Sequence, residues 1–136
     1  MVRMMLAAVL ALGIWAPVGA QDGPRATVQG TVQGQIEAFL RDDLEAAFDF
    51  ASPGIRRFFG DPGQFGAMVR RGFPMVWRPA DVRFLELREY GGLTFQNVMI
   101  RDGDGVFHVL EYQMELAENG WQINGVRIVV QPEVGA

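Results

Sequence analysis

The sequence contains no cysteine and no lysine, and these two absences exclude several kinds of chemistry. Without cysteine the chain can form no disulfide, offers no thiol nucleophile and has no sulfur to which a lipid could be attached. Without lysine it has neither a Schiff-base nucleophile nor the lysine of a phosphate-binding loop. The single histidine, His108, excludes the common zinc sites that are built on several histidine or cysteine ligands. We therefore expect no metal and no cofactor.

Serine is almost as scarce: Ser52 is the only serine in the chain. It precedes Pro53, and this pair is typical of a helix N-cap followed by proline at the first helical position. The surrounding residues do not form the nucleophile elbow of a serine hydrolase. The only catalytic chemistry left is proton transfer by a carboxylate, an imidazole or a phenol.

One uncharged, apolar run covers residues 4–16, after Arg3 and before Pro17 and the small residues that end at Ala20. This pattern predicts a secretory signal peptide over residues 1–20, and hence a secreted protein of the bacterial periplasm. The run is shorter than the roughly 20 residues that a spanning helix needs, so we expect no membrane span after cleavage. The alternative is an uncleaved anchor.

Removal of residues 1–20 leaves 11 basic and 16 acidic residues, a net charge of −5. An acidic chain repels phosphate backbones, which makes nucleic acid a poor candidate partner. The remaining length fits one domain. We predict a flexible lead-in over residues 21–30, the domain over residues 31–130 and a tail over residues 131–136.

Apolar residues recur at spacings of three and four from residue 31 to residue 51, which predicts one long amphipathic helix. Two short helices are predicted after it. The first starts at Ser52 and runs to Phe59, and the second starts at Asp61 and ends near Gly72 and Pro74.

After Pro79 the apolar residues alternate instead, with period two. Four strands are predicted over residues 82–88, 93–101, 106–116 and 121–130, joined by short glycine-rich connections. Such connections join antiparallel neighbours. The predicted fold class is α+β: a long N-terminal helix and two short helices packed on a curved, four-stranded antiparallel meander.

The segments DDLEAAFDFASPGIRRFFG and FGAMVRRGFPMVWRP, with the strand that ends WQINGVRI, resemble the bacterial domain-of-unknown-function family DUF4864. This family is similar to the superfamily of nuclear transport factor two and the SnoaL cyclases. The resemblance implies a cystatin-like, SnoaL-like cone in which the sheet wraps the long helix. The superfamily contains isomerases, dehydratases, cyclases, transport factors and dimerisation modules, so the fold does not select a function. The chain lacks strand-like sequence between its first helices, which predicts a shallower pocket.

Three side chains are candidates for proton transfer. Asp43 falls on the predicted apolar stripe of the first helix, and period two places His108 and Tyr112 on one face of the third strand. If the helix packs on that face, the three converge and can move a proton on a bound organic ligand. The alternative is structural: Asp43 accepts hydrogen bonds from backbone or from an arginine, and His108 fills a polar gap.

Five arginines lie between residues 56 and 78, interleaved with aromatic residues, in an otherwise acidic chain. They are Arg56, Arg57, Arg70, Arg71 and Arg78, beside Phe58, Phe59, Phe73 and Trp77. Such a patch could hold an anionic ligand or an acidic segment of a partner. The alternative is that these arginines favour helix C-termini or pair with surface acids. The residues predicted to line a ligand site are Asp43, His108, Tyr112, Phe39, Trp77 and Arg78.

Two glycine-containing motifs have structural interpretations. The run Asp102-Gly-Asp-Gly105 has the oxygen ligands of a calcium loop, but strands flank it, which favours a hairpin turn. The pair Asn124-Gly125 inside the last strand predicts a β-bulge that bends the sheet.

Three functions are compatible with these features. The leading hypothesis is a secreted, non-catalytic module that binds a small apolar molecule or a protein. The second is a small acid–base enzyme, an isomerase or dehydratase, that uses Asp43 and His108. The third is a structural homodimer, because apolar residues are predicted on both faces of the last strand and at Phe107 and Val109, so that the outer face of the sheet needs a cover.

Overall fold

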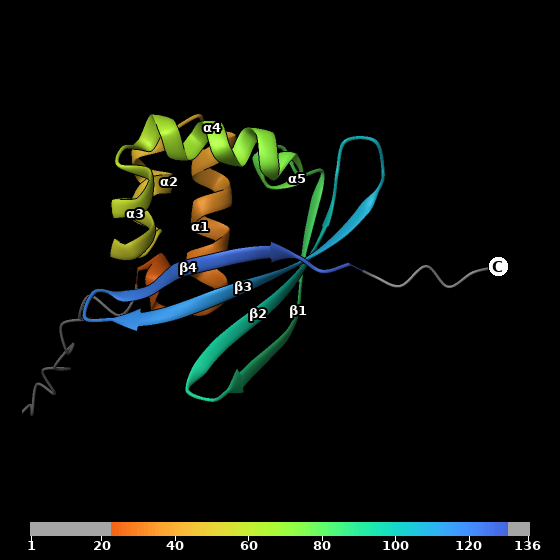
Figure 1. The fold of residues 1–136 in the computed structure, drawn as a ribbon. Coiled ribbons are helices and arrows are strands. Elements are labelled where there is room, and N and C mark those ends of the chain that lie inside the picture. Colours follow the sequence, from red (N-terminus) through yellow and green to blue (C-terminus); the bar gives the residue numbers. More distant parts are fainter. Residues whose placement is uncertain (1–22, 131–136) are drawn as a thin grey trace, which may run out of the picture.

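The computed structural model describes residues 23–130, and the predicted signal segment and C-terminal tail lie outside these residues. The helices precede the strands, as predicted for an α+β protein (Figure 1). The elements are η2 (Pro24–Ala26), α1 (Val28–Leu40), α2 (Leu44–Asp49), α3 (Pro53–Phe59), α4 (Pro62–Gly72), α5 (Pro74–Trp77), β1 (Asp81–Tyr90), β2 (Leu93–Arg101), β3 (Phe107–Ala117) and β4 (Gly120–Ile128).

The strands form one antiparallel meander in the order β1-β2-β3-β4. Their ends agree with the predicted strands to within two residues. The turn between β1 and β2 is Gly91-Gly92, and both residues have positive φ angles of 59° and 79°. A two-residue hairpin favours this conformation, which glycine adopts without a steric penalty.

A bulge in β1 bends the edge of the sheet. The pairing of β1 with β2 shifts between Phe84 and Leu87, which removes Leu85 and Glu86 from the regular ladder. The amide nitrogen of the fully buried Gln96 donates hydrogen bonds to the carbonyl oxygens of both residues, at 3.2 Å each. These hydrogen bonds replace the ladder partners that the two carbonyls lose, so the side chain of Gln96 on β2 stabilises the bulge in β1.

A second bulge lies in β4, where the sequence predicts it. Gln113 pairs with Gly125 and Met114 pairs with Ile123, so Asn124 has no partner on β3. The extra residue changes the alternation of side chains along the strand. Ile123 and Val126 consequently face the same side of the sheet and line one cavity. The predicted two-sided apolar character of the last strand is therefore wrong, because it assumed an unbroken period of two.

The predicted long helix over residues 31–51 is also wrong, since it is interrupted between α1 and α2. Asp42 has a φ angle of 57°, and Asp43 is the N-cap of α2 through a 3.1 Å hydrogen bond that its carboxylate accepts from the backbone N–H of Ala46. Aspartate tolerates the left-handed region and is a preferred N-cap. The apolar spacing continues across the break, which is why periodicity alone does not reveal it.

The first helix begins earlier than predicted. Thr27 caps α1 by accepting a hydrogen bond from the backbone N–H of Gly30 at 2.9 Å. Residues 28–30 are therefore helical, and the predicted lead-in over residues 21–30 is wrong for these three residues. The buried side chain of Val28 explains the extension, because it adds one more turn to the apolar face.

Arg78 stabilises the break between α1 and α2. Its guanidinium donates hydrogen bonds to the carbonyl oxygens of Phe39 at 2.9 Å and Trp77 at 2.8 Å, and to the carboxylate of Asp42 at 2.6 Å. It thereby joins the end of α1 to the end of α5, just before β1 starts. The arginine predicted to line a ligand site instead satisfies helix-end carbonyls.

Two of the shorter helices, α3 and α4, begin as their sequences predict. Ser52 and Asp61 accept hydrogen bonds from the third backbone N–H that follows each of them, and a proline follows each cap. The helix α4 ends at Gly72, as expected. The four-residue helix α5 is an addition that the sequence analysis does not contain, because one turn leaves no periodic pattern.

The helices gather on one face of the sheet, over β3 and β4 (Figure 1). A short bridge joins the two layers: the backbone N–H of Ile123 donates to the carbonyl of Phe50 at 2.9 Å, and that of Ser52 donates to the carbonyl of Ile123 at 2.8 Å. The hydroxyl of Ser52 also donates to Oδ1 of Asn124 at 2.7 Å. Ser52 is fully buried, so it caps α3 and anchors that helix to the bulge of β4.

Replacing Ser52 by alanine is expected to lower the free energy of unfolding by about 2–4 kcal/mol, since it removes a helix cap and leaves the Asn124 oxygen without its donor. The measurement is urea unfolding followed by circular dichroism. Thr27→Ala is the matched control because Thr27 caps a helix at an exposed position, and we expect it to lose only about 1 kcal/mol. Equal losses in the two variants would contradict the anchoring role.

Candidate functional site

A cavity of about 270 Å³ lies between the helical layer and the strands β3 and β4. Its walls are almost entirely aliphatic and aromatic. The lining residues are Gln35, Phe39, Ala51, Ile55, Phe59, Phe65, Met68, Val69, Phe73, Val76, Tyr112, Ile123, Gly125 and Val126.

The burial of the lining residues distinguishes a floor from a mouth. The side chains of Phe39, Phe65 and Tyr112 are buried and form the floor. Half-buried residues surround the opening, among them Ile55 and Phe59 of α3, Met68 of α4 and Val126 of β4. The cavity therefore opens between α3, α4 and β4, next to the anchor that Ser52 makes.

Ile55 and Phe59 face the cavity because they are four residues apart on α3, and Phe65 and Val69 repeat this spacing on α4. The sequence predicts both helices, but its pattern does not indicate that they line a site. The available signal was that each short helix has one apolar face, which needs a partner to cover.

Tyr112 lines the cavity, as predicted, and is completely buried. Its hydroxyl has no hydrogen-bond partner among the described residues. Burial raises the pKa of this phenol far above its usual value of 10.0, because the charged form would lose its hydration. The ring therefore remains a neutral phenol across the physiological pH range.

Gln35 is the other polar side chain of the cavity wall. Its amide nitrogen donates a hydrogen bond to the carbonyl of Ala47 at 3.1 Å, which fixes the orientation of the amide. Within residues 23–130 no hydrogen bond reaches its amide oxygen. The carboxamide thus offers an oriented acceptor to a cavity whose other polar group is the buried hydroxyl of Tyr112.

Of the other predicted site residues, Phe39 lines the cavity and Trp77 packs against it, with ring centroids 5.6 Å apart. Trp77 itself is outside the cavity wall. Arg78 lies over the face of Trp77, 4.8 Å from the ring centroid, in addition to its contacts with the α1 end. Trp77 and Arg78 therefore pack behind the cavity wall and do not line the cavity.

Asp43 does not lie on an apolar stripe facing the sheet, which corrects its predicted placement. Its side chain is 47% exposed and caps α2, and Oδ2 lies 4.0 Å from the guanidinium of Arg41. The cause is the helix break, which turns the chain at Asp42. Asp43 is not part of the cavity wall.

His108 is on the inner face of β3 but beyond the cavity, at the end of the β2–β3 hairpin. Its Nε2 donates to Oδ2 of Asp102 at 2.8 Å, and Oδ1 of Asp102 accepts the backbone N–H groups of Asp104 and Val106. Asp102 therefore stabilises a hairpin turn. This agrees with the prediction that residues 102–105 form a turn and not a calcium loop. The structure does not bring Asp43 and His108 together with Tyr112 at the cavity.

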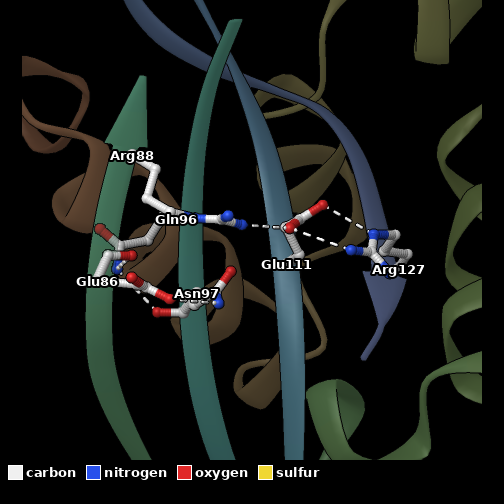
Figure 2. A network of polar contacts seen from close by, with 6 residues as sticks. All are labelled: Glu86, Arg88, Gln96, Asn97, Glu111 and Arg127. Carbon is white, nitrogen blue, oxygen red and sulfur yellow. Dashed lines mark hydrogen bonds and ion pairs between the residues drawn. The ribbon is translucent and has the colours of Figure 1, made fainter. Parts of the chain in front are cut away.

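A network of charged and polar groups crosses the outer face of the sheet (Figure 2). The buried carboxylate of Glu111 accepts hydrogen bonds from Arg127 at 2.8 Å and from Arg88 at 2.7 Å. The hydrogen bond from Arg127 contributes most to lowering the pKa of Glu111, and Arg88 adds to it, while desolvation opposes the shift. Asn97 donates to Glu86 beside this group at 3.4 Å. The network makes the centre of that face polar.

Among residues 23–130, no group of three or more histidine, aspartate or glutamate side chains is placed to hold a metal ion. In the same part of the chain, no helix combines the length and the apolar composition that crossing a membrane requires.

Residues 21–136 match the family described as "Domain of unknown function (DUF4864)". The chain belongs to this family, as its sequence predicted. No curated protein matches it.

Two solved structures are similar to the chain. One is the solution structure of a SEC-C motif containing protein from Rhodopseudomonas palustris, with a TM-score of 0.57, 18% identity, and coverage of 78% of this chain and 81% of that one. The other is an NTF-2 like protein of unknown function from Shewanella oneidensis MR-1, with a TM-score of 0.45, 14% identity, and coverage of 72% and 92%. At such identities the first likeness concerns the fold alone.

The contact between Asp102 and His108 predicts a pH dependence of stability. The hydrogen bond from His108, followed by that from the backbone of Val106, holds the pKa of Asp102 below its ordinary value of 3.8. A lowered folded-state pKa stabilises the protein above the unfolded pKa, and this contribution disappears as the pH falls through the folded value. NMR titration of the Asp102 carboxyl carbon should show a midpoint below 3.8 that rises in His108→Leu. A wild-type midpoint at or above 3.8 contradicts the interaction.

Proposed function

We propose that this member of the DUF4864 family binds a small apolar molecule in the cavity between the helical layer and β3–β4, without catalysing a reaction on it. The observation that carries the proposal is the cavity of about 270 Å³ with its almost wholly apolar wall. An apolar cavity of about 150 Å³ is enough to hold benzene in another protein. A substituted ring or a short branched chain therefore fits the volume of this one.

The chemistry of the wall favours binding over acid–base catalysis. A general acid or base must lie within hydrogen-bond reach of the proton that it transfers. Among the described residues the cavity wall contains no carboxylate and no imidazole, and the raised pKa of its phenol, Tyr112, prevents that group from acting as a base. Asp43 and His108 are both engaged elsewhere, so their positions do not support the alternative of an isomerase or dehydratase.

The polar part of the wall narrows the class of ligand. The amide of Gln35 is oriented by Ala47 so that its oxygen is the available group. An acceptor in an apolar pocket favours a ligand that has one hydroxyl or N–H donor on an apolar body. We propose phenol-like or alcohol-like molecules as this class.

We also propose that the protein acts outside the cytoplasm. The support is the predicted signal peptide over residues 1–20, which lies outside the described residues.

The ligand class is tested with 4-ethylphenol and ethylbenzene, two probes that differ only by a hydroxyl group. Both should bind at the cavity and shift the amide NMR signals of α3, α4 and β4. The phenol should bind about fivefold more tightly, because a net hydrogen bond contributes about 1 kcal/mol. Gln35→Met should abolish this preference, whereas Gln33→Met, a neighbouring change outside the cavity wall, should preserve it.

The site itself is tested with Val69→Phe, which fills the cavity from α4 and should weaken both probes by about tenfold or more. Ala67→Phe, on the exposed side of the same helix, is the matched control and should leave both affinities unchanged. Equal binding to wild type and Val69→Phe would show that the probes bind elsewhere.

A homodimer through the outer face of the sheet is a second proposal. Phe107 is on that face and is 61% exposed, and the paired residues Val109 and Met99 are half-buried beside it. A symmetric copy would cover these side chains. Light scattering at micromolar concentration should then show a dimer that Phe107→Glu dissociates. A wild-type monomer at this concentration contradicts the proposal.

A further inference from the structure

Positive charge in this chain is concentrated in the segment from α3 to the end of α5. Residues 53–78 contain five arginines and one acidic residue, Asp61, although the whole chain has 16 acidic and 12 basic residues. The protein as a whole is thus acidic, while the helices around the cavity mouth are basic.

Four of these arginines form no ion pair and no side-chain hydrogen bond within residues 23–130: Arg56, Arg57, Arg70 and Arg71. Of the five arginines in this segment, only Arg78 has an acidic partner within residues 23–130, and that partner is Asp42. The four lie in the last turns of α3 and α4, where the helix dipole favours a cation. That position stabilises the helix ends, and it leaves Arg57, Arg70 and Arg71 exposed and Arg56 half-buried, with guanidinium groups that an anionic surface could contact.

A large aromatic side chain projects from the same helix. Phe58 follows Arg57 and is 81% exposed. Its ring packs edge-on against Phe59 with centroids 5.0 Å apart, and Phe59 lines the cavity and contacts Phe65 at 5.6 Å. Aromatic side chains therefore form a continuous path from the surface at α3 to the interior of the cavity.

We propose that α3 docks on an anionic lipid bilayer, with Phe58 entering the interface and Arg56 and Arg57 contacting lipid phosphates. Arginine attracts anionic headgroups, and an aromatic residue on a short helix can bury itself at the acyl boundary. Arg70 and Arg71 of α4 add to the local positive charge. Because the net charge of the chain is −4, an anionic bilayer repels the rest of the molecule. The basic face formed by α3 and α4 is the part that the bilayer attracts.

A bilayer fits these features better than an acidic protein does. Phe58 protrudes from a helix instead of lining a groove, and the cavity mouth is bordered by Ile55 and Phe59 of the same helix. The docking itself does not depend on the proposed function, since it can occur whether or not the cavity is filled.

The test is sedimentation of the full chain with vesicles of phosphatidylcholine alone or mixed two to one with phosphatidylglycerol. Binding should require phosphatidylglycerol and should weaken at high salt. The double variant Arg56→Gln/Arg57→Gln should bind about tenfold or more weakly. Phe58→Ser should also bind more weakly, most clearly at high salt, where the apolar contribution remains.

The matched control is Arg83→Gln/Arg101→Gln, which removes two exposed arginines from β1 and β2 and should leave vesicle binding unchanged. All variants keep residues 1–20, so this segment cannot produce a difference between them. Equal binding to both kinds of vesicle, or equal binding by the α3 variant and wild type, would overturn the proposal. So would binding to poly-glutamate that the α3 variant loses, together with no vesicle binding, which would identify an acidic protein as the partner.

Discussion

The hydrogen bonds of Ser52 are the interaction on which the cavity depends. The hydroxyl caps α3 and donates to Asn124, while the backbone on either side of Ala51 pairs with Ile123. These contacts fix one end of α3 over the bulge of β4. The mouth of the cavity lies between α3 and β4. The extra residue of the bulge turns both Ile123 and Val126 inward, so the same irregularity supplies the anchor and part of the wall.

The charged groups of the protein are kept away from this apolar interior. Glu111 is compensated by two arginines on the outer face of the sheet, Asp42 by Arg78 at a helix end, and Asp102 by His108 at a hairpin turn. A buried charge is costly unless it is paired, and each of these pairs is either exposed or outside the cavity. An interior without charge suits the retention of an apolar molecule, whereas proton transfer needs a titratable group at the ligand.

The two irregularities of the chain show where prediction from sequence succeeds and where it fails. The pair Asn124-Gly125 predicts the bulge, but an unbroken period of two would put Ile123 and Val126 on opposite faces of β4, and the extra residue brings them to the same face. Periodicity does not predict the break between α1 and α2, because the apolar spacing persists through Asp42 and Asp43. Aspartate is a preferred N-cap residue, and as the cap of α2 Asp43 lies away from the apolar stripe on which the periodicity places it.

The sequence by itself determined the α+β class, the family, the positions of α3, α4 and all four strands, and the caps at Ser52 and Asp61, because these depend on periodicity, turn residues and local hydrogen bonds. The tertiary structure alone decided which side chains share the cavity and which pair outside it. Tyr112 and His108 lie on the same face of β3, but the helices cover only Tyr112. The reason is that packing between distant segments leaves no local pattern in the chain.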